Sequence, residues 1–301
     1  FRLTSERVEL LGPEVADAAR RIGAQLSAAQ APRGPQASIE AAAVPGHWAF
    51  EGALPQWHAA LGLLVWADTL APALHVATAA GDRILAHADA PIEALLPTPG
   101  GVAARWGAGW HHVALDGTVS SSAATEALPR PQALALCADP AGALWACTAD
   151  NGRWAVGPVD GAAGWSLAEP VTALAWDAAG ELLHMAASGS GTVWTARRGS
   201  PTLRRLATLP KGSGHLAGLA VDAAGGVWSA LRGGWGVLRL EADGTLDRMW
   251  ALPVPCPSGV ALGGEDGRTL FVTSARDAVS RDALDAAPLS GRLFSLRTHA
   301  G

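Results

Sequence analysis

The sequence is poor in the features that bind nucleic acids and membranes. Its 301 residues include a single lysine, Lys211, and the formal net charge is −5. An acidic chain without a basic run lacks the cations that neutralise phosphates, so we expect no nucleic-acid partner through this region and no anionic membrane partner. No apolar run reaches the roughly 18 to 20 residues that span a bilayer. The first 21 residues carry charges throughout, without the apolar core of a signal peptide.

Cysteine is scarce as well. The three cysteines, Cys137, Cys147 and Cys256, are widely spaced and show no CxxC or metal-ligand pattern. We therefore expect them to be small buried residues in strands. Their usage favours a reducing, cytoplasmic location.

Tyrosine is absent, whereas tryptophan occurs 13 times. A sugar-binding wall of indoles is one interpretation, but most of these positions fit strands in which the ring packs on its neighbours. The packing group includes Trp145, Trp194 and Trp228, and the better candidates for a pocket wall, nearer loops, are Trp57, Trp106 and Trp235.

What the chain does contain is a repeat. Hydrophobic residues make up 49% and charged residues 16%, enough for a sizeable core. The stretches 134–148, 173–187, 218–231 and 259–273 each read as an apolar strand, an Asp/Gly turn and a second apolar strand. Glycine tolerates the positive φ that such a turn needs, so each stretch predicts a β-hairpin.

The spacing of the turn glycines predicts the fold. Gly142, Gly180, Gly225 and Gly267 are separated by 38, 45 and 42 residues, and steps of similar length lead back to Gly101 and Gly62. Six such units, each with room for four short strands, predict an all-β, six-bladed β-propeller over 38–301. The last strand, 291–297, is expected to pair with a strand around 38–44 and close the ring.

The first 29 residues do not follow this repeat. Apolar residues recur at helical spacing over 4–29, and the Pro-, Gly- and Ala-rich stretch 30–37 is typical of a linker. The helical segment resembles the C-terminal helix of the effector-binding domain in IclR-type transcriptional regulators. On that resemblance the chain would be the end of a longer regulator; a capping helix at the rim of the propeller is the alternative.

Residues 45–297 resemble the gluconolactonase–regucalcin family, most closely over 218–276. The resemblance implies a hydrolase that opens sugar-acid lactones with a divalent cation, Ca²⁺, Zn²⁺ or Mn²⁺. Such a metal polarises the lactone carbonyl and lowers the pKa of the attacking water. Its ligands would come from the starts of the inner strands and converge at the mouth of the central channel.

The residues that match the family's metal-ligand motifs are altered here. The stretch EGALPQW places Ala53 where the family has a glutamate, and Glu51 could serve only if Ala53 and Leu54 form a local bulge. Val171 and Thr172 stand where the family's PNG motif supplies an asparagine ligand, and Leu216 and Ala217 stand where its PDG motif has proline and the aspartate ligand. The resemblance therefore implies the fold more directly than the chemistry, and we assign no catalytic residue.

Five residues remain as candidate ligand-binding groups. Arg130 could pair with a ligand carboxylate, while Gln132, Thr172 and Ser258 could donate hydrogen bonds, and His215 lies two residues before the altered Asp position. The other single histidines, His58, His75 and His184, are interpreted as packed or surface residues.

Three functions stay open. The first is a lactonase-like propeller with a degenerate metal site, binding a sugar acid or lactone as the ligand-sensing domain of a regulator. The second is a metal-dependent sugar lactonase with a rearranged site around Glu51. The third is a protein–protein scaffold, because propellers also serve as docking platforms.

Overall fold

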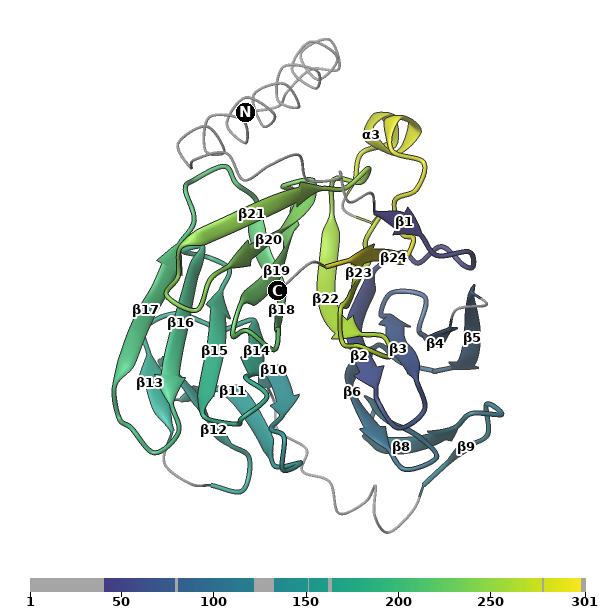
Figure 1. Cartoon of the computed structure of the whole chain (residues 1–301). Coiled ribbons are helices and arrows are strands. Elements are labelled where there is room, and N and C mark those ends of the chain that lie inside the picture. Colours follow the sequence, from purple (N-terminus) through teal and green to yellow (C-terminus); the bar gives the residue numbers. More distant parts are fainter. Residues whose placement is uncertain are drawn as a thin grey trace. The chain divides into compact units, whose positions relative to one another are not determined.

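The structure is a computed structural model that describes residues 41–78, 81–121, 133–150, 152–161, 164–277 and 279–298. Six four-stranded antiparallel sheets are arranged in a ring (Figure 1). The predicted all-β, six-bladed propeller is therefore confirmed. The helix expected over 1–29 and the linker expected over 30–37 lie outside the described residues.

Blades 1 to 5 run outward from an innermost strand in chain order, and blade 6 does so until its outermost strand, which is β1. Blade 1 contains β2 (Gly52–His58), β3 (Leu63–Asp68), β4 (Ala73–Thr78) and β5 (Gly81–His87), and blade 2 contains β6 (Ile92–Thr98), β7 (Gly101–Trp106), β8 (Gly109–Ala114) and β9 (Val119–Ser120). Blade 3 contains β10 (Ala133–Ala138), β11 (Leu144–Asp150), β12 (Arg153–Pro158) and β13 (Trp165–Leu167), and blade 4 contains β14 (Ala173–Trp176), β15 (Leu182–Ala187), β16 (Thr192–Arg197) and β17 (Leu203–Thr208). Blade 5 contains β18 (His215–Val221), β19 (Val227–Arg232), β20 (Gly236–Leu240) and β21 (Leu246–Ala251), and blade 6 contains β22 (Pro257–Gly263), β23 (Thr269–Ser274), β24 (Phe294–Arg297) and β1 (Ala42–Ala43).

The ring closes as the sequence predicts. β1, the first described strand, pairs antiparallel with β24, the last one, with Ala42 opposite Ser295 and Ala43 opposite Phe294. The final blade is thus completed by residues from the other end of the described chain. This pairing covers the edge of β24, which an open sheet would leave unpaired.

The predicted hairpin turns depend on glycines with positive φ. Gly142, Gly180, Gly225 and Gly267 have φ values of 88°, 68°, 81° and 67°. In blade 2 the prediction is off by one residue, because Gly100, not Gly101, adopts the positive φ. Gly101 instead begins β7, so the count of repeats holds while that turn shifts.

Two of the turns each contain a buried aspartate with the same kinds of partner. Asp222 accepts from the Trp228 indole at 2.9 Å and from the Arg239 Nε at 2.7 Å, and its other oxygen accepts the Gly226 amide at 2.8 Å. Asp139 in blade 3 repeats this arrangement with Trp145 and Arg198. In each turn one aspartate therefore both fixes the turn and accepts a hydrogen bond from a tryptophan. Trp145 and Trp228 pack inside the blades, as expected.

Helix is nearly absent from the described ranges. The segment Arg281–Ala286 forms α3, whose first turn is capped by the Ser280 side chain. Across the part of the chain that the structure describes, no helix has the length and apolarity to cross a membrane. Of the three cysteines, which are free thiols, Cys147 is buried in a strand as predicted. Cys137 lies in a strand but is only partly buried, and Cys256 is buried but immediately precedes β22.

Candidate functional site at the channel mouth

The starts of the innermost strands meet at one end of the central channel. Ser258, at the start of β22, donates to the Gly52 carbonyl at the start of β2. Ser188, which follows β15, donates to the Leu216 carbonyl at the start of β18. We call this end the channel mouth; it comprises Glu51, Gly52, Thr172, Ser188, His215, Leu216, Arg232, Trp235, Ser258 and Asp277.

An ion pair links two blades at the mouth. Arg232, the last residue of β19 in blade 5, donates from its two terminal nitrogens to the two Glu51 oxygens at 2.6 and 2.7 Å. Asp277 from blade 6 approaches the same guanidinium at 3.4 Å. The side chains are only partly exposed, at 31% for Arg232 and 18% for Glu51. A two-pronged contact of this kind is among the strongest that arginine makes.

Burial and charge act in opposite directions on the Glu51 carboxyl. Burial raises the pKa of Glu51, the nearby Asp277 raises it further, and the hydrogen bonds from Arg232 lower it; the outcome is a pKa above the usual value. The hydrogen bonds that Arg232 donates to Glu51 raise the pKa of the Arg232 guanidinium. One permanent cation therefore lies between the carboxyl groups of Glu51 and Asp277.

A second set of polar groups lines the mouth on blades 4 and 5. The Thr172 and Ser188 hydroxyls lie 2.5 Å apart, and the His215 Nδ1 lies 3.4 Å from the Ser188 carbonyl oxygen. Thr172 and His215 are both exposed. The structure thus brings together two of the residues predicted from sequence, whereas Val171, the alternative to Thr172, is fully buried in the core.

The bulge that Glu51 requires is present. The register of β2 against β3 shifts between Ala53 and Gln56, and Leu54 has a φ of 55°. A bulge re-aims the side chains beside it. Ala53 remains part-buried at the expected ligand position. Similar shifts occur in β18 and β22, the innermost strands of blades 5 and 6.

A calcium-type cation does not fit the mouth as it is arranged. Such an ion takes six to eight oxygen ligands, several of them carboxylate oxygens. Both Glu51 oxygens accept hydrogen bonds from Arg232, and Asp277 contacts the same guanidinium. The Thr172 hydroxyl already contacts Ser188, and Ala217 offers no oxygen from its side chain. The Glu51 and Asp277 carboxylates are paired with the Arg232 guanidinium, so they are not available as metal ligands in this arrangement.

The remaining predicted ligand-binding residues have different outcomes. Ser258 is part-buried, and its hydroxyl contacts the Gly52 carbonyl and lies 3.1 Å from the Thr273 hydroxyl, so it braces two strands. Arg130 and Gln132 lie outside the described residues and stay predictions. Sequence reasoning missed Arg232, although the hairpin register places it directly opposite His215.

Among the three tryptophans proposed for a pocket wall, Trp235 has an exposed side chain. It is 40% exposed, lies in the turn three residues after Arg232 and has a φ of 56°. Positive φ is costly for a bulky residue and often marks a functional position. The other two are packed instead: Trp57 stacks on Phe271, and Trp106 is 5% exposed and stacks on His111.

Comparisons with solved structures agree with the fold. Regucalcin from Agrobacterium tumefaciens, described as a calcium-binding protein, matches with a TM-score of 0.70 and 19% identity over 87% of this chain and 95% of that one. A gluconolactonase from Xanthomonas campestris matches with a TM-score of 0.63 and 19% identity over 89% of this chain and 98% of that one. At such identities the likeness shows the propeller fold alone.

Sequence comparisons point to the same group. A 6-deoxy-6-sulfogluconolactonase from Pseudomonas putida is 46% identical over 66 residues, which are 22% of this chain and 23% of that enzyme. The match therefore spans about a quarter of the relative. The family model for the SMP-30/gluconolactonase/LRE-like region matches residues 51–276, which is most of the chain. This protein accordingly belongs to the SMP-30/gluconolactonase/LRE-like family.

Proposed function

We propose that this protein binds a neutral sugar lactone at the channel mouth, and that Arg232 takes the place of a divalent cation there. The observation that carries the proposal is the two-pronged contact between Arg232 and Glu51, at 2.6 and 2.7 Å. A guanidinium has five N–H donors, and the contacts with Glu51 and Asp277 engage three of them. Among the described residues the remaining two donors have no partner, and they would bind a lactone carbonyl oxygen.

The charges favour a lactone over the corresponding sugar acid. Arg232 is flanked by the carboxyl groups of Glu51 and Asp277, so the cluster carries no surplus positive charge. An anionic ligand would meet like charge at close range in a partly desolvated place. A neutral ring with several hydroxyl groups meets donors and acceptors without that repulsion.

Other residues of the mouth support a sugar ligand. Trp235 presents an exposed indole face, on which the apolar face of a sugar ring could stack. Thr172 and His215 offer exposed polar atoms on the neighbouring blades. As a ligand-sensing domain of a regulator, the propeller would report lactone occupancy to the segment before residue 38, a role that rests on the resemblance of residues 4–29.

Metal-dependent lactone hydrolysis is the second candidate. The bulge at Ala53 and Leu54, which Glu51 needs in order to act as a ligand, favours it. Family membership and the short match to a sulfogluconolactonase also support it. This candidate requires Arg232 to leave Glu51 before a cation could bind.

Hydrolysis assays separate the two candidates. The rate of gluconolactone opening is measured with the full chain in EDTA and with added Ca²⁺, Zn²⁺ or Mn²⁺, each against the spontaneous rate. Binding without metal-stimulated hydrolysis would support the first candidate. Hydrolysis that rises with one of these cations and disappears in Glu51→Gln would instead establish the lactonase.

A further inference from the structure

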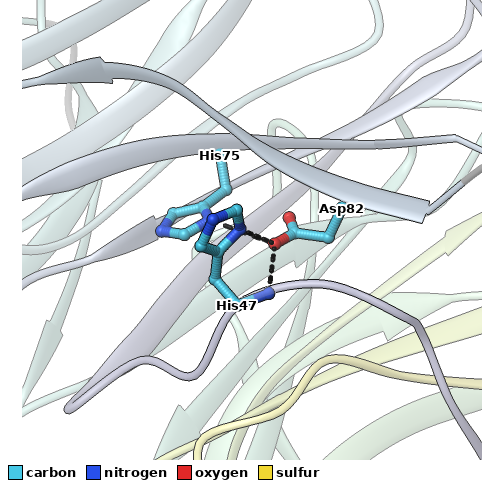
Figure 2. Close-up of side chains that lie close together, drawn as sticks. All are labelled: His47, His75 and Asp82. Carbon is cyan, nitrogen blue, oxygen red and sulfur yellow. Dashed lines mark hydrogen bonds and ion pairs between the residues drawn. The ribbon is translucent and has the colours of Figure 1, made fainter.

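A second cluster of candidate ligands lies away from the channel mouth, on the outer strands of blade 1. His75 comes from β4, Asp82 from the outermost strand β5, and His47 from the segment between β1 and β2 (Figure 2). One potential ligand atom of each residue lies within 4.8 Å of the other two. The His75 and Asp82 side chains are 3% and 2% exposed, while His47 is 48% exposed.

The distances in this cluster suit metal ligands better than hydrogen bonds. The Nδ1 atoms of His47 and His75 each lie 3.3 Å from the Asp82 Oδ2. Charge-assisted hydrogen bonds between nitrogen and a carboxylate are about 2.7–2.9 Å long. Ligand atoms about 2.0–2.1 Å from a tetrahedral zinc ion lie about 3.3 Å from one another, as these two pairs do. His47 is half exposed, so it has the freedom to close the third side of the triangle.

The Asp82 carboxylate is held in place by a hydrogen bond from a neighbouring tryptophan. The Trp66 indole donates to the Asp82 Oδ1 at 2.8 Å, while Oδ2 faces the two imidazoles and accepts the His47 amide at 3.2 Å. Trp66 also stacks on the His75 ring, with centroids 4.0 Å apart. Outer residues that orient a carboxylate and an imidazole in this way are characteristic of protein metal sites.

The backbone brings His47 to this position. The Asp82 amide donates to the Pro45 carbonyl at 2.8 Å. A Cβ on Gly46 would lie 2.4 Å from the Asp82 Cβ, and one on Gly81 would lie 2.9 Å from the Pro45 carbonyl oxygen. Both positions therefore need glycine for the segment before β2 to pack on β5, so the cluster is pre-formed.

From this geometry we infer that His47, His75 and Asp82 form a binding site for a divalent transition metal, zinc above all, with a fourth position open to solvent beside His47. Two imidazoles and one carboxylate are a ligand set that zinc accepts. The ion would join the segment that follows the closing strand β1 to blade 1. It would therefore stabilise the ring where the two ends of the described propeller meet. This inference does not depend on the proposed lactone site.

The test is a titration of the full chain, freed of metal with EDTA and then dialysed, with ZnCl₂ by calorimetry and with CoCl₂ by visible absorption. One zinc ion per chain is expected, together with the absorption bands of four-coordinate Co²⁺. His47→Ala should abolish both signals, and since His47 is half exposed this variant should fold. Trp66→Phe should weaken zinc binding by about 10- to 100-fold, because it removes the hydrogen bond to Asp82 and reduces the ring that stacks on His75.

Two control variants make the result specific. His87→Ala removes another exposed histidine from the same strand as Asp82 and should leave the zinc affinity unchanged. Glu51→Gln alters the channel mouth and should also leave it unchanged. The inference is overturned if the wild-type chain binds no zinc, if His47→Ala binds it as tightly as wild type, or if Glu51→Gln rather than His47→Ala removes binding.

Discussion

Glu51 and Arg232 are 181 residues apart in sequence, yet their side chains meet at 2.6 and 2.7 Å at the channel mouth. Glu51 precedes the innermost strand of blade 1, and Arg232 ends the second strand of blade 5. The pair joins two blades with blade 6 between them in the ring. It therefore contributes to the closure of the propeller and also determines what the mouth can bind.

Breaking this pair should cost stability. Glu51→Gln is expected to lower the free energy of unfolding by about 1.5–3 kcal/mol, because Arg232 loses charge-assisted hydrogen bonds in a partly buried place. Urea denaturation measures the change. Glu181→Gln is the matched control, since its partner Arg197 and Glu181 itself are 61% and 57% exposed. That variant should change stability by less than about 1 kcal/mol; equal losses in the two variants would contradict the account.

The two turn aspartates should differ in their importance. Asp222→Asn removes the most buried carboxylate partner of Arg239, whose side chain is 6% exposed, and leaves Glu241 and Asp247 beside it, so we expect a loss of about 1.5–3 kcal/mol. Asp139→Asn removes the same kind of turn and indole contacts, but its partner Arg198 is 40% exposed and can be solvated. The smaller loss should therefore come from Asp139→Asn in thermal or urea unfolding. The reverse order would contradict the assignment of the larger loss to the buried charge of Arg239.

Acid should destabilise blade 4 through His184. This side chain is 2% exposed, and burial lowers its pKa from 6.5 to about 4, with Asp177 and Arg204 as the nearby charges. The unfolded chain binds the proton more readily, so the stability is fully present above pH 6.5 and is lost as the pH falls towards 4. The loss approaches about 3 kcal/mol from this group.

The pH dependence of urea denaturation tests this prediction. His184→Gln should flatten the stability curve between pH 6.5 and 4. His87→Gln, at an exposed position, should keep the wild-type slope. An unchanged slope in His184→Gln would show that other groups cause the acid sensitivity.

Replacing Trp235 should raise the stability of the protein and weaken ligand binding. Its φ of 56° is costly for any residue except glycine, so Trp235→Gly should raise the stability by about 1 kcal/mol. The same change removes the exposed ring and should weaken lactone binding at least tenfold. Thermal unfolding and calorimetry measure the two effects. A variant that is more stable and binds equally well would exclude Trp235 from the ligand site.

The fold was predictable because its signals are local. An Asp/Gly turn between two apolar runs can be recognised within about 15 consecutive residues. Its recurrence at Gly142, Gly180, Gly225 and Gly267 reveals the repeat. The prediction that 38–44 closes the ring is confirmed by the pairing of β1 with β24. The bulge at Ala53 and Leu54 entered only as the condition for Glu51 to act as a ligand, and the structure contains it.

The sites were less predictable because they depend on neighbours in space. Arg232 is the partner of Glu51 only after six blades have closed, and no window of sequence contains both residues. His75 looked isolated, and its interpretation as a packed or surface histidine is incomplete: it is buried, but it contacts Asp82 beside His47. His47 lies in a connecting segment outside the hairpin pattern, so periodicity carried no information about it.

The central claim is that Arg232, and not a metal ion, supports ligand binding at the mouth. It is tested most directly by calorimetric titration of gluconolactam, a lactone analogue that resists hydrolysis, into the full chain in EDTA and in Ca²⁺. We predict equal affinity in the two conditions, lost in Arg232→Gln and kept in Arg248→Gln, a change on the outermost strand of the same blade. Binding that needs Ca²⁺ and survives Arg232→Gln would contradict the account.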